Sequence, residues 1–177
     1  YKIFSNLLSR KLSPILDSNQ CPDQAGFRKE FSTTDHLMAA SLIIEKAQEW
    51  QIQLWVAAID FAKAFDSIEH EYIWQALEDQ GVAPGYIRLL KNLYDKQTGT
   101  VVTDVESRKF DINRGTKQGD PLSTLLFNAV LESIFRRLKR SWSQKKFGLE
   151  LGLAGSAHLT NLRFADDVLL FANTRLS

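Results

Sequence analysis

The sequence predicts an α+β domain in which helices lie on one face of a small antiparallel sheet. Several long segments carry apolar residues at helical spacing, one short apolar run has the composition of a strand, and two segments have the pattern of β-hairpins. Along the chain the order is helices, strand, helices, hairpin, loop and helix, then hairpin. Helices and strands grouped in runs of this kind favour an α+β architecture.

The composition fits one globular domain. The 177 residues are enough to bury a core, and 44% hydrophobic with 24% charged residues are ordinary globular values. A net charge of +1 gives no global attraction to nucleic acid but leaves a locally basic groove open. The single cysteine excludes an intrachain disulfide or a cysteine metal cluster and fits a reducing compartment. No apolar stretch approaches a membrane span and no signal peptide opens the chain, which begins at Tyr rather than Met, so we expect a piece of a longer protein.

Two helices are expected before the first strand. Residues 1–17 carry apolar side chains at helical spacing, and after a polar loop Ser32 or Thr33 can cap a second helix. The apolar positions of the first helix are Ile3, Phe4, Leu7, Leu8, Leu12 and Ile15, and those of the second include Leu37, Ile44 and Ala47.

A strand and two further helices are expected next. Residues 54–59 form a continuous apolar run, which is typical of a buried strand. Asp66 and Glu69 resemble a capping box for a helix that Gly81 would stop. Pro84 then begins another helix.

The last part of the chain predicts two hairpins separated by a long helix. Residues 98–115 have a hairpin pattern. Asp120 is placed to cap, and Pro121 to begin, a helix that runs to about Arg140. Residues 161–172 form the second hairpin.

Two adjacent carboxylates, Asp166 and Asp167, interrupt the apolar run NLRFADDVLLFA. A hairpin turn and a metal site explain them about equally well, because Asp-Asp without glycine is a poor turn but a good oxygen donor pair. A third carboxylate, Asp60, stands where the predicted strand ends. If that strand lies beside the hairpin, the three carboxylates converge, and one or two Mg²⁺ ions would offset their repulsion. Two such ions about 4 Å apart can activate an attacking oxygen and stabilise a leaving phosphate oxygen.

Two other segments are ambiguous. The loop GTKQGDPLS (residues 115–123) could offer backbone N–H groups to an anion, but a plain loop-to-helix junction is the preferred interpretation. The basic stretch around Trp142, and the pair Arg28 and Lys29, could contact a nucleic-acid backbone, although solvated surface charges explain them more simply.

Four segments, taken in order, resemble the reverse transcriptase domain of non-LTR (LINE-like) retrotransposons, with the RTE type as the suggested subgroup. QAGFRKEFSTTDHL resembles the fingers-to-palm segment of that family, and AAIDFAKAFDSIEHEYIWQAL resembles its first catalytic motif. GTKQGDPLSTLLFN resembles its nucleotide-facing motif, and LRFADDVLLFA its Asp-Asp motif. Order and spacing agree over nearly the whole chain.

The resemblance implies a right-hand polymerase palm with part of the fingers. Residues 1–177 would be one reverse transcriptase domain fragment, with fingers-to-palm helices over about 1–53 and the palm over 54–177. The thumb, the fingers strands with the basic triphosphate contacts and the endonuclease would lie outside it, so we do not expect this piece to be active alone. Thr124 departs from the family pattern, which commonly has proline after the serine.

The resemblance also implies a catalytic site. Asp60 and Asp166 would hold two Mg²⁺ ions, which Mn²⁺ could replace. Asp167 would support the site as a further ligand, and the carbonyl of Phe61 would add another. In the implied reaction a primer 3′-hydroxyl attacks the α-phosphate of a dNTP and releases pyrophosphate.

Further positions would contact substrate and nucleic acid. Phe65 would be the steric gate that excludes a 2′-hydroxyl, and Gln118 and Gly119 would line the nucleotide pocket. Ser123 would help shape the template side, and Arg28 is a candidate template contact. The implied partners are an RNA template, a DNA primer or nicked target DNA, and dNTPs, with no membrane. The parent element would act inside the cell, in cytoplasm and nucleus.

Three alternatives stay open: a maturase-type reverse transcriptase, an RNA-copying RNA polymerase, and a non-enzymatic relic or scaffold. Phe65 argues against the RNA polymerase, which must admit the 2′-hydroxyl. A scaffold has no need of metal ligands, yet Asp60, Asp166 and Asp167 are all present.

Overall fold

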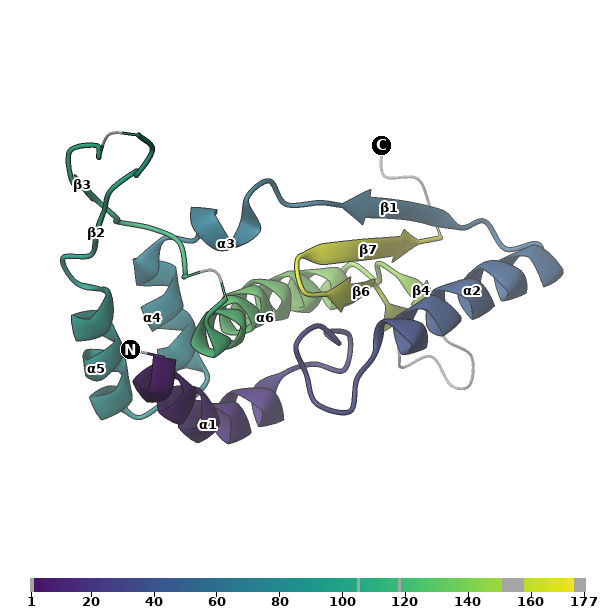
Figure 1. The fold of residues 1–177 in the computed structure, drawn as a ribbon. Helices are drawn as coiled ribbons and strands as arrows, with labels where there is room; N and C mark the ends of the chain where they lie inside the picture. Colours follow the sequence, from purple (N-terminus) through teal and green to yellow (C-terminus); the bar gives the residue numbers. More distant parts are fainter. Residues whose placement is uncertain (1, 105, 118, 151–157, 174–177) are drawn as a thin grey trace. The chain divides into compact units, whose positions relative to one another are not determined.

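The α+β prediction is confirmed by the computed structural model, which describes residues 2–104, 106–117, 119–150 and 158–173. The chain forms two compact units (Figure 1). Unit 1 comprises Tyr1–Asn19 and Ala62–Ser133, and unit 2 comprises Gln20–Phe61 and Ile134–Ser177. Each unit is made of two separate stretches of the sequence. The predicted division into fingers-to-palm helices (about 1–53) and palm (54–177) is a different one and stays a prediction.

Unit 1 is mainly helical. Its elements are α1 (Lys2–Asn19), α3 (Ala64–Ser67), α4 (His70–Asp79), α5 (Pro84–Tyr94), the first part of α6 (Pro121–Gln144), and the hairpin of β2 (Thr98–Gly99) with β3 (Phe110–Asp111). Helices α1, α4, α5 and α6 share one buried apolar cluster, to which α1 contributes Leu8, Leu12 and Leu16. Three of the apolar positions predicted for this helix are not in the core, since Ile3, Phe4 and Leu7 are 89%, 40% and 56% exposed.

Local signals set most helix ends in unit 1. Pro84 occupies the first turn of α5, and Gly81 has φ 78° just after α4. The carboxylate of Asp120 accepts a hydrogen bond from the N–H of Leu122 at 3.1 Å and another from the hydroxyl of Ser5. This carboxylate therefore caps α6, as predicted.

The predicted capping box of Asp66 and Glu69 is wrong. Asp66 belongs to the short helix α3, and Glu69 is the N-cap of α4 but makes no side-chain capping bond. Ile68 is extended (φ −66°, ψ 123°) and separates the two helices. The spacing of Asp66 and Glu69 fits a capping box, but the two residues lie on either side of the break between α3 and α4.

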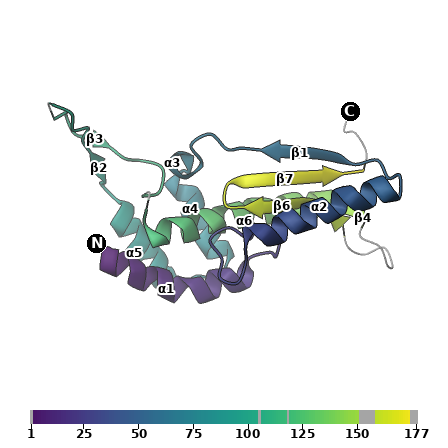
Figure 2. The same ribbon diagram turned by 45° about the vertical axis from the view of Figure 1, so that its right-hand side comes forward.

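Unit 2 is built on a three-stranded antiparallel sheet (Figure 2). Its elements are α2 (Thr33–Glu49), β1 (Trp55–Ile59), β4 (Leu149–Glu150), β5 (His158–Leu159), β6 (Asn161–Phe164), β7 (Asp167–Ala172) and the last part of α6. The sheet has the order β1-β7-β6, and β4 and β5 form a separate pair. Ser32 caps α2 through a capping box with Asp35.

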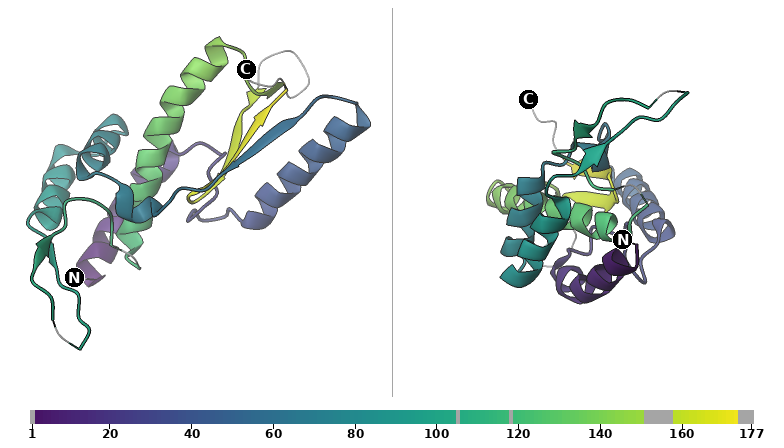
Figure 3. Two further views of the ribbon diagram at one scale, coloured as in Figure 1. Left: turned by 90° about the horizontal axis from the view of Figure 1, so that it is seen from above. Right: turned by 60° about the vertical axis from the view of Figure 1, so that its left-hand side comes forward.

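The expectation that residues 54–59 form a buried strand is wrong in one respect. The strand exists as β1, but all five of its residues are exposed. In the described sheet β1 pairs with β7 alone, so it is an edge strand (Figure 3). An apolar run predicts a strand, but whether anything covers it depends on tertiary neighbours.

Helical side chains contact both faces of the unit 2 sheet, where the sequence predicted one face. On one face Leu162 and Phe171 form a cluster with Leu149, against which part of α2 packs through Ala39, Ala40 and Ile43. Arg163 alternates to the other face, where its guanidinium lies 4.3 Å from the ring centre of Phe135 in α6. Leu37 and Ile44, the apolar positions predicted for α2, are 67% and 44% exposed.

Among the described residues, no helix combines the length and apolar character that crossing a bilayer would require.

We expect Leu12→Ala to destabilise the chain by about 2–5 kcal/mol, because Leu12 is fully buried in the unit 1 cluster. Leu37→Ala is the matched control, since Leu37 is largely exposed on α2, and should change stability by less than about 0.5 kcal/mol. Urea unfolding of both variants measures the difference. Equal losses would contradict the placement of α1 in the core.

Candidate functional site

The pairing of β1 with β7 brings two predicted carboxylates to one end of the sheet. Ile59, the last residue of β1, pairs with Val168. Asp60 follows Ile59, so the continued antiparallel register places it opposite Asp167, the first residue of β7. Residues opposite one another in such a pair have Cα atoms about 4.5–5.5 Å apart. The structure thus brings together two aspartates that are distant in sequence.

Asp166 lies in the two-residue turn that joins β6 to β7. Phe164 pairs with Asp167, so Ala165 and Asp166 alone form the turn. Asp166 is half-buried and Asp167 is exposed, which leaves both carboxylates open to solvent. The hairpin turn is therefore confirmed, and it is compatible with a metal site because it presents the carboxylates at the strand ends.

The turn contains a strained residue. Ala165 has φ 56°, in the left-handed region that glycine adopts most easily. For alanine this conformation costs about 1–2 kcal/mol, so the surrounding structure has to hold it. No sequence pattern predicted the residue that contacts it: Gln24 is fully buried, and its side-chain oxygen accepts a hydrogen bond from the Ala165 N–H at 3.0 Å.

The residue types at this end of the sheet suit a hard divalent cation. Carboxylate and carbonyl oxygens are the ligands that Mg²⁺ prefers, and the Phe61 carbonyl directly follows Asp60. In the part of the chain that the structure describes, no three His, Cys, Asp or Glu side chains are already gathered closely enough to hold a metal. The donors and the strand register therefore fit a cation, but the aspartate side chains would have to turn toward it.

Arg28 ties together the loop that precedes α2. Its guanidinium donates hydrogen bonds to the carbonyl oxygens of Cys21 and Gln24, both at 3.0 Å, and lies 4.2 Å from the ring centre of Phe31. These contacts give Arg28 a local role, and the template contact stays a prediction.

Phe65, in α3, contacts both α6 and the loop before it within unit 1. Its ring stacks on that of Phe127, with centroids 4.3 Å apart and planes at 21°. Its carbonyl accepts the N–H of Thr116 at 2.8 Å, and the N–H of Gly115 donates to the Ile68 carbonyl at 2.7 Å. The predicted steric gate and the predicted nucleotide-facing loop therefore form one packed segment.

The other predicted substrate contacts have different surroundings. Gly119 is exposed with φ 75°, and a Cβ there would meet nothing within 4 Å. Ser123 is 1% exposed in the first turn of α6. Gln118 lies outside the described residues. The nucleotide-pocket and template-side roles of these residues stay predictions.

A buried tyrosine lies against the start of α6. Tyr94 is 3% exposed, and its ring meets those of His70 and Trp74 edge-on, with centroids 5.0 and 5.7 Å apart. Burial raises the pKa of Tyr94 to about 12; the Ser123 hydroxyl acts to lower it and the Asp120 carboxylate to raise it. The phenol is therefore neutral at physiological pH.

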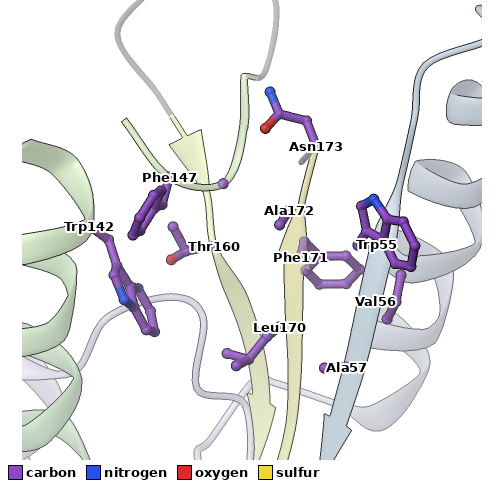
Figure 4. A pocket seen from close by; sticks show the side chains of 11 residues that line it. Trp55, Val56, Ala57, Trp142, Phe147, Thr160, Leu170, Phe171, Ala172 and Asn173 are labelled. Atoms are coloured by element: carbon purple, nitrogen blue, oxygen red, sulfur yellow. The ribbon is translucent and has the colours of Figure 1, made fainter. Parts of the chain in front are cut away.

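An apolar pocket of about 260 Å³ lies in unit 2 at the other end of β7 from the aspartates (Figure 4). Trp55 and Trp142 flank it, and Leu170 lies between them. None of its lining residues is charged, so the pocket differs in character from the end of the sheet that carries the aspartates.

The whole chain matches one protein family. The family described as reverse transcriptase (RNA-dependent DNA polymerase) matches residues 1–177. The chain therefore belongs to the reverse transcriptase family, as its motifs indicated.

Similar proteins include the Pol polyproteins of R2 retrotransposable elements. The chain is 32% identical over 178 residues to that of type-2 element R2DM from Drosophila melanogaster, covering 97% of this chain and 16% of that protein. It is 35% identical over 175 residues to that of a type-1 element R2 from Nasonia vitripennis, again covering 97% and 16%. The chain thus spans a small part of these relatives. R2 is a non-LTR element, so the non-LTR assignment is confirmed, whereas the RTE subgroup stays a prediction.

Solved telomerase structures share the fold. Apo telomerase from Candida tropicalis superposes with a TM-score of 0.67 at 12% identity, over 99% of this chain and 35% of that one. Telomerase from Candida albicans gives 0.62 at 14% identity, over 98% and 30%. The predicted palm with part of the fingers is confirmed.

We expect stability to fall as the pH rises from about 10 through 12. The folded-state pKa of Tyr94, about 12, exceeds the value of about 10 for an unfolded tyrosine, so the stabilisation is complete below pH 10 and is lost as Tyr94 ionises. Over this window the loss is about 2–3 kcal/mol. Urea unfolding of the parent and of Tyr94→Phe at several pH values measures it, and an equally steep loss in Tyr94→Phe would assign the effect to other groups.

Proposed function

We propose that this chain provides the catalytic core of an RNA-directed DNA polymerase that adds dNTPs to a primer 3′-hydroxyl. Membership of the reverse transcriptase family supports the reaction class. The single observation that carries the site assignment is the β1–β7 register, which puts Asp60 opposite Asp167 beside the turn that bears Asp166. The template would be RNA, and the primer a DNA end or nicked target DNA.

The three aspartates and the Phe61 carbonyl would hold two Mg²⁺ ions, with Mn²⁺ as a substitute. When bound, such ions supply Lewis-acid chemistry that favours ionisation of the primer hydroxyl and stabilises charge on the departing pyrophosphate. Asp60 and Asp166 would be the principal ligands, and Asp167 would support them. Their position at exposed strand ends allows substrate and ions to enter from solvent.

Selection of the sugar would fall to unit 1. The ring of Phe65 is fixed by its stacking on Phe127, and its backbone is fixed by Thr116. A rigid aromatic ring rejects an added hydroxyl by steric overlap more effectively than a mobile side chain. Gln118, Gly119 and Ser123 would complete the nucleotide and template sides, and Arg28 would contact the template. The parent element would act in the cytoplasm and nucleus.

Asp166→Asn should abolish primer extension on an RNA template in a complete polymerase that carries this domain. Loss of a ligand to both ions removes several kcal/mol of transition-state stabilisation, a fall of about 10³-fold or more. The fold should persist, because the change removes one of several like charges. Asp95→Asn, at the C-cap of α5, is the control and should leave the rate unchanged. Extension by Asp166→Asn at the parent rate would refute the site.

Phe65→Val should admit ribonucleotides. A smaller side chain leaves room for the 2′-hydroxyl, so the ratio of kcat/KM for dNTP to that for rNTP should fall by about tenfold or more. Phe110→Val, on the exposed hairpin strand β3, is the matched control and should keep the parent ratio. An unchanged ratio in Phe65→Val would remove the gate from the proposal while leaving the metal site intact.

A further inference from the structure

The loop before α2 runs alongside the outer edge of β6 (Figure 1). The carbonyl of Asp23 accepts the N–H of Arg163 at 2.6 Å, and the N–H of Ala25 donates to the Arg163 carbonyl at 2.9 Å. Gln24 and Arg163 thus form a parallel bridge. These hydrogen bonds fix the register of the loop against β6, the strand that leads into the aspartate turn.

From this loop the side chain of Gln24 reaches the turn itself. Its oxygen accepts hydrogen bonds from the N–H of Ala165 at 3.0 Å and from that of Gly26 at 2.8 Å. Its nitrogen donates to the carbonyl of Ala165 at 3.1 Å. One carboxamide therefore binds both backbone polar groups of the residue that precedes Asp166.

Gly26 completes the contact. A Cβ at this position would lie 2.0 Å from the nitrogen of Ala165 and 2.7 Å from its Cα. Only glycine allows the two backbones to approach so closely, and this approach brings the Gln24 carboxamide within hydrogen-bonding distance of the turn.

We propose that Gln24 is a positioning residue for Asp166, which acts by holding Ala165 in its left-handed conformation. A hairpin of two residues with alanine at positive φ has other, less strained conformations available. Each of them would redirect the peptide that leads to Asp166. The inference deepens the proposed function and rests on it, since Asp166 has a metal-binding role only there.

Burial alone does not explain the choice of glutamine. Gln24 is 0% exposed, and an apolar side chain of similar length would fill the same volume without polar groups to satisfy. The amide instead directs its three hydrogen bonds at the turn and at its own loop. Its contribution is therefore to the conformation of the turn.

The first test measures the turn directly and needs no activity. In the parent chain the Ala165 amide should exchange slowly with solvent deuterium, and in Gln24→Met its exchange should accelerate by about tenfold or more, because it loses its acceptor. The Arg163 amide, held by the Asp23 carbonyl, should change much less. Gln80→Met is the matched control, since Gln80 is another buried glutamine, bonded to the carbonyls of Ala76 and Ala129 in unit 1. It should leave the Ala165 exchange rate unchanged.

The second test measures catalysis in a complete polymerase that carries the domain. Gln24→Met should lower kcat for primer extension by about 10- to 100-fold while KM for dNTP changes little, because only the placement of a catalytic ligand is altered. The Mg²⁺ concentration for half-maximal rate should rise. Adding Ala165→Gly should restore part of kcat, since glycine adopts positive φ without help. Gln80→Met should keep the parent kcat and Mg²⁺ dependence, with or without Ala165→Gly.

The outcomes separate this inference from the proposed function. Unchanged Ala165 exchange in Gln24→Met would overturn the inference, whatever the activity. Accelerated exchange with parent kcat and Mg²⁺ dependence would also overturn it, leaving Gln24 a structural residue. Accelerated exchange with lowered kcat, recovered by Ala165→Gly, would support it. Primer extension by Asp166→Asn tests the proposed function. Full activity of that variant would refute the metal-binding role of Asp166 and, with it, the positioning role of Gln24.

Discussion

The register between β1 and β7 is the constraint on which the rest of the site depends. A slip of one residue would turn every side chain of β1 to the opposite face and carry Asp60 away from Asp167. Packing fixes the facing of β7, because Phe171 and Leu169 alternate onto the same face as Asp167 and join the cluster that contacts α2. The contacts of α2 therefore set the face of the sheet on which Asp167 lies, and the pairing of β1 with β7 relates Asp60 to it.

The residues proposed for the metal site and those proposed for nucleotide selection belong to different units of the chain. The aspartates and Phe61 lie in unit 2, whereas Phe65, Gly119 and the start of α6 lie in unit 1. Residues 61–64 are the short stretch of chain between Asp60 and Phe65, the proposed gate. Within unit 1 the hydrogen bond from the Thr116 N–H to the Phe65 carbonyl joins α3 to the loop before α6, two segments that are far apart in sequence.

The features that could be predicted from the sequence have local causes. Ser32, Pro84 and Asp120 mark helix starts through their own backbone or capping chemistry, and the structure confirms each. The final hairpin follows equally from two short strands with a break between them. The motif order also indicated the family correctly, because a set of four motifs in register is far more specific than any single one.

The features that could not be predicted depend on distant neighbours. Exposure of β1 is decided by what covers the faces of the sheet, and the exposed faces of α1 and α2 are decided by what packs against them. Gln24 is the clearest case. Gln24 opens the segment that resembles the fingers-to-palm motif, but nothing in that motif points to the aspartate turn, and the contact arises only when β6 folds beside the loop.

An open strand edge is also a template for another strand. Within the described part of the chain no strand pairs with the side of β1 that faces away from β7. Val56 and Ile59 of this strand are exposed, and the strand contains no lysine or proline to discourage pairing. Unless a further strand or another chain occupies this side, molecules of the chain will tend to join edge to edge. Because such pairing requires no unfolding, an uncovered β1 would let correctly folded molecules associate at high concentration.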